Sequence, residues 1–358
     1  MPGAVANHGG PATVPSPEVA PLTIVSDPDA RRWDEYVERH PSGTVEHLFA
    51  WREIFSGVFG QQPVYLAAMR GGHIAGVLPL VKFTSLLFGR SLVSLPYANY
   101  AGLLASSDEA AEALVAHAVE IGRGFGASHV ELRHVDRQLP RLPCREHKVG
   151  ARLALPQTTD ALWGRIDRKV RNQIRKAQKE GLVVDEGTQA LIADFYQVFA
   201  RNMRDLGTPV FPRQLFVDTL SRFDARVFVA RHRGVAVAGA IALGWRDTIL
   251  VPWASSLREY RHLCANMLVY WSMLEYAVGH DYRVFDFGRS SPGGGTHQFK
   301  QQWGATDVPL HWEYAPEGTR PPDHGTSNPR LQLFIRAWQR LPLPVANLVG
   351  PRVIRQIP

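Results

Sequence analysis

The chain has 358 residues, 45% of them hydrophobic and 20% charged, which is ordinary for a soluble globular protein and long enough for two compact units. Its 40 basic and 33 acidic residues give a net charge of +7, a modest excess that fits an anionic partner without requiring one. The two cysteines, Cys144 and Cys264, form no paired motif, so the sequence predicts neither a disulfide framework nor a metal site.

The first twenty residues are interpreted as a disordered tail. They are rich in Gly, Pro, Ala and Val, and no basic segment precedes an apolar one, so they do not resemble a signal peptide. No stretch reaches the ~18 uninterrupted apolar residues that a spanning helix needs. We therefore expect a cytoplasmic protein that could still touch the inner face of a membrane.

An internal repeat organises the chain. Residues 64–80 (VYLAAMRGGHIAGVLPL) align without gaps with residues 227–243 (VFVARHRGVAVAGAIAL), and seven of the 17 positions are identical. Each copy predicts a β-hairpin, because alternating apolar runs flank a glycine, Gly71 or Gly234. The Ala-Gly pair inside each second run predicts a bulge or a close backbone approach.

The elements around the two hairpins repeat as well. Apolar spacing predicts two helices before each hairpin, and a strand, a helix ending at a glycine and a final strand after it. In chain order the predicted helices are 29–40, 47–59, 109–124, 191–205, 212–223 and 264–279, and the final strands are 129–133 and 283–287. This order resembles the GNAT acyltransferase fold, so we predict an α/β (α+β) protein with two tandem GNAT-like domains, 21–156 and 182–316, each a mixed, mostly antiparallel sheet flanked by helices.

A basic helix is predicted to link the two domains, over residues 157–181. Apolar residues at helical spacing give it one buried face, and seven cations face only one acid before Glu180. Because few acidic partners relieve this repulsion, the helix is either a solvated face or an anion site. The candidate anion-binding residues are Lys169, Arg171, Arg175 and Lys176.

The segment 285–304, FDFGRSSPGGGTHQFKQQWG, contains the densest group of candidate functional residues. Glycines after a strand let backbone amides approach a ligand closely. The segment is not a P-loop, because no Lys-Ser/Thr follows the glycines, and it lacks the GxSxG frame of a nucleophile elbow. The candidate ligand contacts in this loop are Ser290, Gly293, Gly294 and Gly295.

Together with KVRNQIRKAQKEG at 169–181, this segment resembles the FemAB family, most closely its branch associated with exosortase and exopolysaccharide systems. The resemblance implies two GNAT-like domains and transfer of an amino acid or acyl group to an envelope precursor, with Phe299-Lys300 at the transferase centre. The long coiled-coil arm of the peptidoglycan-bridge enzymes is absent. No glycine-containing pyrophosphate loop precedes the helix at 264, so the donor stays open between aminoacyl-tRNA and acyl-CoA.

Acyl transfer to an amine passes through an oxyanion, which a cation must stabilise. Lys300 is the candidate for this role, assisted by Arg289 or the loop amides, whereas a surface position for Lys300 and a core position for Phe299 are the alternative. Asp286 is either a base or an ion-pair partner of Arg289. The remaining candidates either bind substrate or simply pack in the interior: Tyr97, Asn99, Tyr100, Phe299 and Trp303.

Three functions follow from these features. The first is a FemAB-like acyl or aminoacyl transferase acting on an amino group of a phosphorylated or lipid-linked envelope or exopolysaccharide precursor, with tRNA a further partner. The second is an acetyl-CoA-dependent N-acyltransferase, and the third a non-catalytic duplicated fold that binds a phosphorylated precursor. No tightly bound cofactor is expected.

In the extension 317–358, a basic amphipathic helix with Leu331, Phe334, Ile335 and Trp338 either contacts a membrane or packs on the second domain.

Overall fold

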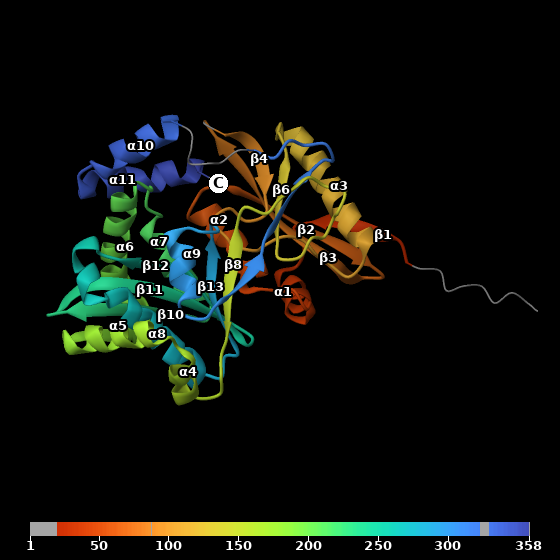
Figure 1. Ribbon diagram of the computed structural model, residues 1–358. Coiled ribbons are helices and arrows are strands. Elements are labelled where there is room, and N and C mark those ends of the chain that lie inside the picture. Colours follow the sequence, from red (N-terminus) through yellow and green to blue (C-terminus); the bar gives the residue numbers. More distant parts are fainter. Residues whose placement is uncertain (1–19, 87, 323–328, 358) are drawn as a thin grey trace, which may run out of the picture.

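The computed structural model describes residues 20–86, 88–322 and 329–357, without the side chains of 329–331. The predicted tail lies outside the described residues except for its last residue, and so does the side chain of Leu331. Two mixed sheets lie side by side, each flanked by helices, and two C-terminal helices lie above the second sheet (Figure 1). The predicted fold class is confirmed.

The first sheet is mostly antiparallel and is covered by three helices. Its strand order is β1-β2-β3-β4-β6-β15-β7, with β5 paired to β3. The strands are β1 (Leu22–Ser26), β2 (Gln62–Arg70), β3 (His73–Ser85), β4 (Gly89–Val93), β5 (Leu104–Ala105), β6 (Val130–His134), β7 (Cys144–Arg145) and β15 (His311–Ala315). The helices are α1 (Ala30–Arg39), α2 (Ala50–Gly57) and α3 (Asp108–Phe125).

The second sheet has the order β14-β8-β13-β12-β11-β10-β9. Its strands are β8 (Val149–Ala154), β9 (Leu182–Gly187), β10 (Ala225–His232), β11 (Val235–Trp245), β12 (Thr248–Ser256), β13 (Val284–Ser290) and β14 (Thr306–Pro309). The helices of this half and of the tail are α4 (Thr159–Arg165), α5 (Arg168–Lys179), α6 (Ile192–Leu206), α7 (Arg213–Arg222), α8 (Ala265–Gly279), α9 (Gly295–Gln301), α10 (Pro329–Gln339) and α11 (Leu343–Val353).

The repeated hairpins are β2–β3 and β10–β11, and both turns use a glycine with positive φ, Gly71 at 55° and Gly234 at 80°. Each hairpin has a bulge next to the Ala-Gly pair. Both glycines of these pairs also sit against backbone. A Cβ on Gly76 would lie 3.0 Å from the Leu104 carbonyl oxygen, and one on Gly239 would lie 3.1 Å from that of Phe228. Both parts of the sequence prediction are therefore confirmed.

The two halves exchange a strand. β8 precedes the linker in the chain but pairs with β13 and β14 in the second sheet, whereas β15 follows β14 but pairs with β6 and β7 in the first. The sheets therefore do not divide where the predicted domains 21–156 and 182–316 divide. One hydrophobic core also spans both halves, as shown by the stacking of Trp51 on Phe223 at 4.8 Å.

The predicted linking helix is two helices, α4 and α5. The backbone is extended at Ile166, and the Asp167 side chain accepts a hydrogen bond from the Lys169 amide at 2.6 Å, which caps α5. The apolar stripe continues across the break because Ile166 and Val170 are both buried. Apolar spacing alone therefore concealed the new N-cap.

The C-terminal helices pack on α6. Trp338 is 5% exposed, and the Arg204 guanidinium donates to the Leu341 carbonyl at 2.9 Å. Gly207, with φ 78°, ends α6 directly below Ile335, where any Cβ would clash. The packing alternative for this tail is thus what the structure shows.

Candidate active site at the junction of the two units

A loop of the first unit forms the junction. β4 and β5 both pair with β3, and residues 94–103 leave the sheet between them. In the second unit, β12 stays paired with β11, with one irregularity in the register. The parallel pairing of β12 with β13 ends at Leu250–Asp286, although both strands continue. The loop carries Asn99 and Tyr100 against the end of β13 where this pairing stops.

Asp286 joins the two units. It is 2% exposed and accepts hydrogen bonds from the Tyr100 hydroxyl at 2.5 Å, the Arg152 Nε at 2.8 Å and the Gly288 amide at 2.7 Å. The proposed pairing with Arg289 is wrong, because Asp286 and Arg152 are direct cross-strand partners on β13 and β8. The ion pair with Arg152 and the hydrogen bond from Tyr100 tie this carboxylate into the junction, so a structural role fits it better than a base.

Arg289 and Lys300 lie at the end of β13. The Arg289 guanidinium donates to the Ala98 carbonyl at 2.5 Å, and the Lys300 Nζ donates to the Gly288 and Arg289 carbonyls, both at 2.9 Å. Lys300 is 6% exposed, and burial lowers its pKa to about 8, with the Arg289 charge adding to the effect. Burial and then the Arg133 charge lower the pKa of Arg289 to about 10. The surface alternative for Lys300 is therefore wrong.

Sequence reasoning missed a second buried carboxylate, Glu46. It precedes α2, is 3% exposed and accepts hydrogen bonds from the backbone amides of Asn99 and Tyr100, each at 2.7 Å, and from the Asn99 Nδ2 at 3.1 Å. Burial raises its pKa to about 7, against the opposing effect of those amides. Glu46 also borders a small cavity of about 30 Å³ that β12 lines with Trp253. The sequence offered only a single acid among neutral residues, which is no distinctive signal.

The other residues expected in the site are distributed more widely. Phe299 and Trp303 pack with Tyr270 in the core of the second unit, which is the core alternative. The Tyr97 hydroxyl donates to the Ile354 carbonyl at 2.9 Å, although its ring lines the same cavity as Glu46. Ser290 is buried at the end of β13, and Gly293, Gly294 and Gly295 form the turn into α9.

The basic helix α5 lies apart from this junction. It packs against α8, on the outer side of the second sheet in Figure 1. Within the described part of the chain none of its four candidate cations forms an ion pair. Arg175 lies 5.3 Å over the Trp163 ring, and the Arg171 Nε is buried without a hydrogen-bond partner. The candidate cations are Lys169, Arg171, Arg175 and Lys176. Their charge is therefore available to an external anion.

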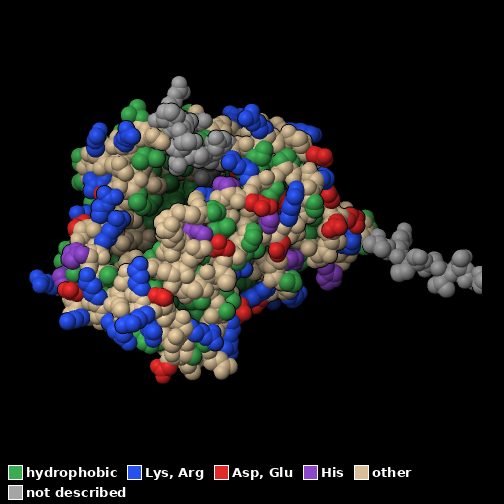
Figure 2. Space-filling view, in the orientation of Figure 1, with side chains coloured by type: hydrophobic (Ala, Val, Ile, Leu, Met, Phe, Trp, Pro, Cys, Tyr) green, Lys and Arg blue, Asp and Glu red, His purple; other side chains and the backbone are tan. Residues whose placement is uncertain are grey.

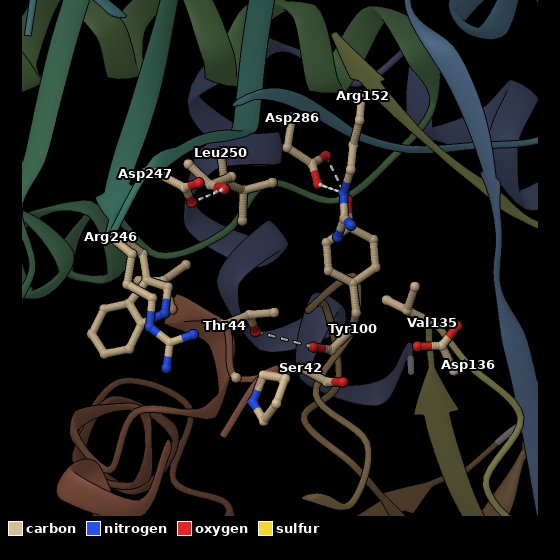
Figure 3. Close-up of a pocket in the computed structure, with 15 residues that line it drawn as sticks. Ser42, Thr44, Tyr100, Val135, Asp136, Arg152, Arg246, Asp247, Leu250 and Asp286 are labelled. Atoms are coloured by element: carbon tan, nitrogen blue, oxygen red, sulfur yellow. Dashed lines mark hydrogen bonds and ion pairs between the residues drawn. The ribbon is translucent and has the colours of Figure 1, made fainter. Parts of the chain in front are cut away.

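A pocket of about 290 Å³ opens below the junction (Figure 3). Arg152 extends between Asp286 and the Tyr100 ring, and Arg246 projects from the opposite wall. Arg246 also donates to the His40 and Val37 carbonyls and so links the units a second time. The walls carry both charge signs, which favours a polar ligand over an apolar one.

The fold also gathers one group of metal-binding residue types that the sequence did not predict. Cys144, Glu146 and His311 place their ligand atoms within 4.8 Å of one another. Glu146 already pairs with the His311 Nδ1 at 3.1 Å, so these two side chains satisfy each other without a metal.

Across residues 20–357, as far as they are described, no helix is long and apolar enough to cross a bilayer.

Comparisons with known proteins agree with this fold. Residues 164–301 match the family described as Acetyltransferase (GNAT) domain, and no curated protein sequence matches the chain. The chain is similar to FemX, with a TM-score of 0.61, 16% identity, and 81% of this chain and 96% of that one covered. It is similar to a tandem GNAT protein from the clavulanic acid biosynthesis pathway, with a TM-score of 0.54, 15% identity and coverages of 85% and 100%.

A third similar structure is L-PGS from Bacillus licheniformis, with a TM-score of 0.54, 13% identity and coverages of 91% and 97%. At these identities the likeness shows a shared fold. The fold is therefore a tandem GNAT fold, in which two GNAT-like units lie side by side.

Proposed function

We propose that the protein is an acyl or aminoacyl transferase that acylates an amino group on a cell-envelope or exopolysaccharide precursor. The observation that supports this most is the buried Lys300 beside Arg289, at the point where β12 and β13 stop pairing and the first unit supplies Glu46. Perturbed pKa values gathered at one junction are typical of catalytic sites. The link to exosortase systems rests on the resemblance carried by residues 169–181 and 285–304.

In the proposed reaction the acceptor nitrogen attacks the donor carbonyl. A C–N bond forms, the bond from carbon to the leaving oxygen or sulfur breaks, and the leaving group takes up a proton. Glu46, whose pKa of about 7 suits proton exchange near neutrality, removes the proton from the amine. Lys300 and Arg289 stabilise the oxyanion.

An acetyl-CoA-dependent transferase is the second candidate, because the matching family is an acetyltransferase family. The segment before α8 argues against it. Residues Arg258–Leu263 form a 3₁₀-helix, and the amides of Tyr260 and Cys264 donate to carbonyls within this segment. These amides are therefore not free to cradle a pyrophosphate. The non-catalytic alternative predicts precursor binding without turnover.

One donor experiment separates the three functions. The purified chain is mixed with an amine acceptor and either acetyl-CoA, a longer acyl-CoA or aminoacyl-tRNA, and the loss of donor and the gain of amide are measured. We expect transfer from aminoacyl-tRNA, weakened by salt and by Arg175→Ala, because α5 would hold the polyanion. Transfer from a CoA ester alone would replace the first function with the second, and binding without transfer would favour the third.

The role of Glu46 predicts a pH dependence. A base with a pKa of about 7 must lose its proton to act, so kcat/KM should rise as pH increases through 7, until the loss of the Lys300 proton near pH 8 lowers it again. Glu46→Gln should remove this rise and lower the rate by roughly 10²–10⁴-fold. The pH-rate profiles of both proteins are the measurement, and a rise that survives in Glu46→Gln would exclude Glu46.

The free energy of unfolding should change with pH in the direction opposite to the rate. The folded pKa of Glu46 is above the ordinary value of 4.5, so between about pH 4.5 and 7 the folded chain retains a proton that the unfolded chain releases. The free energy of unfolding should therefore fall across this window in the parent relative to Glu46→Gln. Denaturant titrations at several pH values measure it.

Contact with an anionic membrane is proposed for the C-terminal helices. Residues 329–358 contain five arginines and no acid. Leu333 and Leu348 are 69% and 68% exposed although both helices pack on α6. Apolar side chains beside cations favour the surface of an anionic bilayer, where a lipid-linked acceptor would reside.

The membrane proposal predicts selective vesicle binding. The parent chain should sediment with phosphatidylglycerol-containing vesicles and not with phosphatidylcholine alone. Leu333→Asp combined with Leu348→Asp should weaken this binding about tenfold or more, because two apolar anchors are lost. Val235→Asp, which changes an exposed apolar residue of β11, is the matched control. Equal binding by the double variant would contradict the proposal.

A further inference from the structure

A group of cations lies beside the proposed active site, on the face of β13 toward the first unit. Lys148 precedes β8, and its Nζ donates to the Ser291 hydroxyl at 2.7 Å. Arg289 lies on the neighbouring strand β13, where it pairs with Gly150 of β8. Arg133 approaches from β6, and the guanidinium carbons of Arg133 and Arg289 lie 4.2 and 5.5 Å from the centroid of the Trp312 ring.

These cations repel one another. Burial lowers the pKa of Lys148, and the charges of Arg289 and Arg133 lower it further. The pKa of Arg289 is likewise lowered by burial and then by Arg133. Protonated groups that depress each other's pKa values in this way would gain from a nearby anion.

Glu46 and Glu131 compensate part of the Arg289 charge, but they raise its pKa by less than burial and Arg133 lower it. Among the described residues, neither Lys148 nor Arg289 forms an ion pair with a carboxylate. Glu131 is engaged by Arg133 at 2.8 Å, and Asp286 by Arg152. The Trp312 Nε1 is buried and has no hydrogen-bond partner, which leaves one more donor unused in the group.

We propose that Lys148 and Arg289, with the Ser291 hydroxyl and Arg133 nearby, bind a phosphate or diphosphate group of the substrate. A guanidinium, an ammonium and a hydroxyl that converge are suited to phosphate oxygens. The ends of β8 and β13 that carry these residues lie beside a hollow visible in this face of the molecule (Figures 1 and 2). The inference rests on the proposed function and assigns a phosphorylated substrate to the same junction.

Inorganic pyrophosphate is the probe, titrated calorimetrically into the full chain at constant ionic strength. Lys148→Met keeps the side-chain length and removes the charge, and it should weaken binding about tenfold or more. Lys82→Met, which changes another half-buried lysine outside this group, should leave the affinity unchanged. Equal pyrophosphate affinity in the parent and Lys148→Met would overturn the site, as would Lys148-dependent binding of glucuronate without binding of pyrophosphate.

Ligand-free melting temperatures give a second test. Because Lys148→Met relieves repulsion, its melting temperature should equal or exceed that of the parent, whereas loss of a purely structural lysine would lower it. If Lys148→Met fails to fold, Ser291→Ala is tested instead, because it removes the hydroxyl that Lys148 contacts. Weaker pyrophosphate binding by Ser291→Ala would support the site, and unchanged binding would overturn it.

The source of the phosphate is read from two further titrations, a UDP-sugar and uncharged tRNA. Lys148-dependent affinity for either one supports the site and names the source. These measurements need no acyl donor and no turnover. The donor experiment can therefore fail while pyrophosphate binding persists, and the reverse can also occur, so the two proposals fail separately.

Discussion

Asp286→Ala is expected to lower the free energy of unfolding by about 2–4 kcal/mol. The substitution leaves the Arg152 guanidinium, the Tyr100 hydroxyl and the Gly288 amide without their shared acceptor. Breaking a fully buried ion pair costs about 3–5 kcal/mol, and we expect less here because the Arg152 side chain is 32% exposed and water can reach it.

Denaturant titration followed by tryptophan fluorescence measures this change. Asp247→Ala is the matched control. Asp247 lines the same pocket, but its carboxylate is exposed and lies outside the junction. Its free energy of unfolding should stay within about 0.5 kcal/mol of that of the parent. The double variant with Arg152→Met should recover part of the loss, because the unpaired cation is then removed. A parent-like midpoint for Asp286→Ala would show that the junction does not depend on this carboxylate.

Lys300→Met is expected to lower kcat by roughly 10²–10³-fold, the usual effect of losing one oxyanion donor. The measurement is turnover with the donor that the transfer experiment identifies. Because Lys300 also holds the Gly288 and Arg289 carbonyls, a loss of rate alone would not separate chemistry from positioning. Lys82→Met, on β3 and outside both the junction and α5, controls for the change in net charge.

The pH profile makes the separation. A lysine that must carry charge, with a pKa of about 8, predicts that kcat falls as pH rises above 8, and Lys300→Arg should move this fall to higher pH if it remains active.

The free energy of unfolding should also depend on the Lys300 proton. Between about pH 8 and 10.5 the unfolded chain holds a proton that the folded chain has released, so the free energy of unfolding should rise with pH in the parent and not in Lys300→Met. Unchanged turnover in Lys300→Met would exclude the proposed mechanism.

Local patterns predicted the local structure well. The hairpins were recognised because strand alternation and a turn glycine are encoded within ~17 adjacent residues. The same holds for the bulges beside Gly76 and Gly239 and for the helix predicted over 109–124, which the structure extends to Phe125 before Gly126. The linker was predicted less well, because Asp167 starts a new helix without interrupting the apolar stripe.

The candidate site was predicted only where one short motif contains it. Asp286, Arg289 and Lys300 come from a single segment, and the fold keeps them together at the end of β13 and in α9. The partners that determine their chemistry are distant in sequence. Glu46, Arg152 and Lys148 come from other strands and loops, and no spacing rule connects them to residues 285–304.

By itself the sequence determined the duplicated α/β architecture and the segment that contains the candidate catalytic cation, because periodicity, turn chemistry and short motifs depend on neighbouring residues. Only the tertiary structure decided the exchange of β8 and β15, the Asp286–Arg152 pair and the raised pKa of Glu46. Strand partners and burial are properties of residues far apart in the chain, and the dielectric environment that shifts a pKa exists only once those residues have packed together.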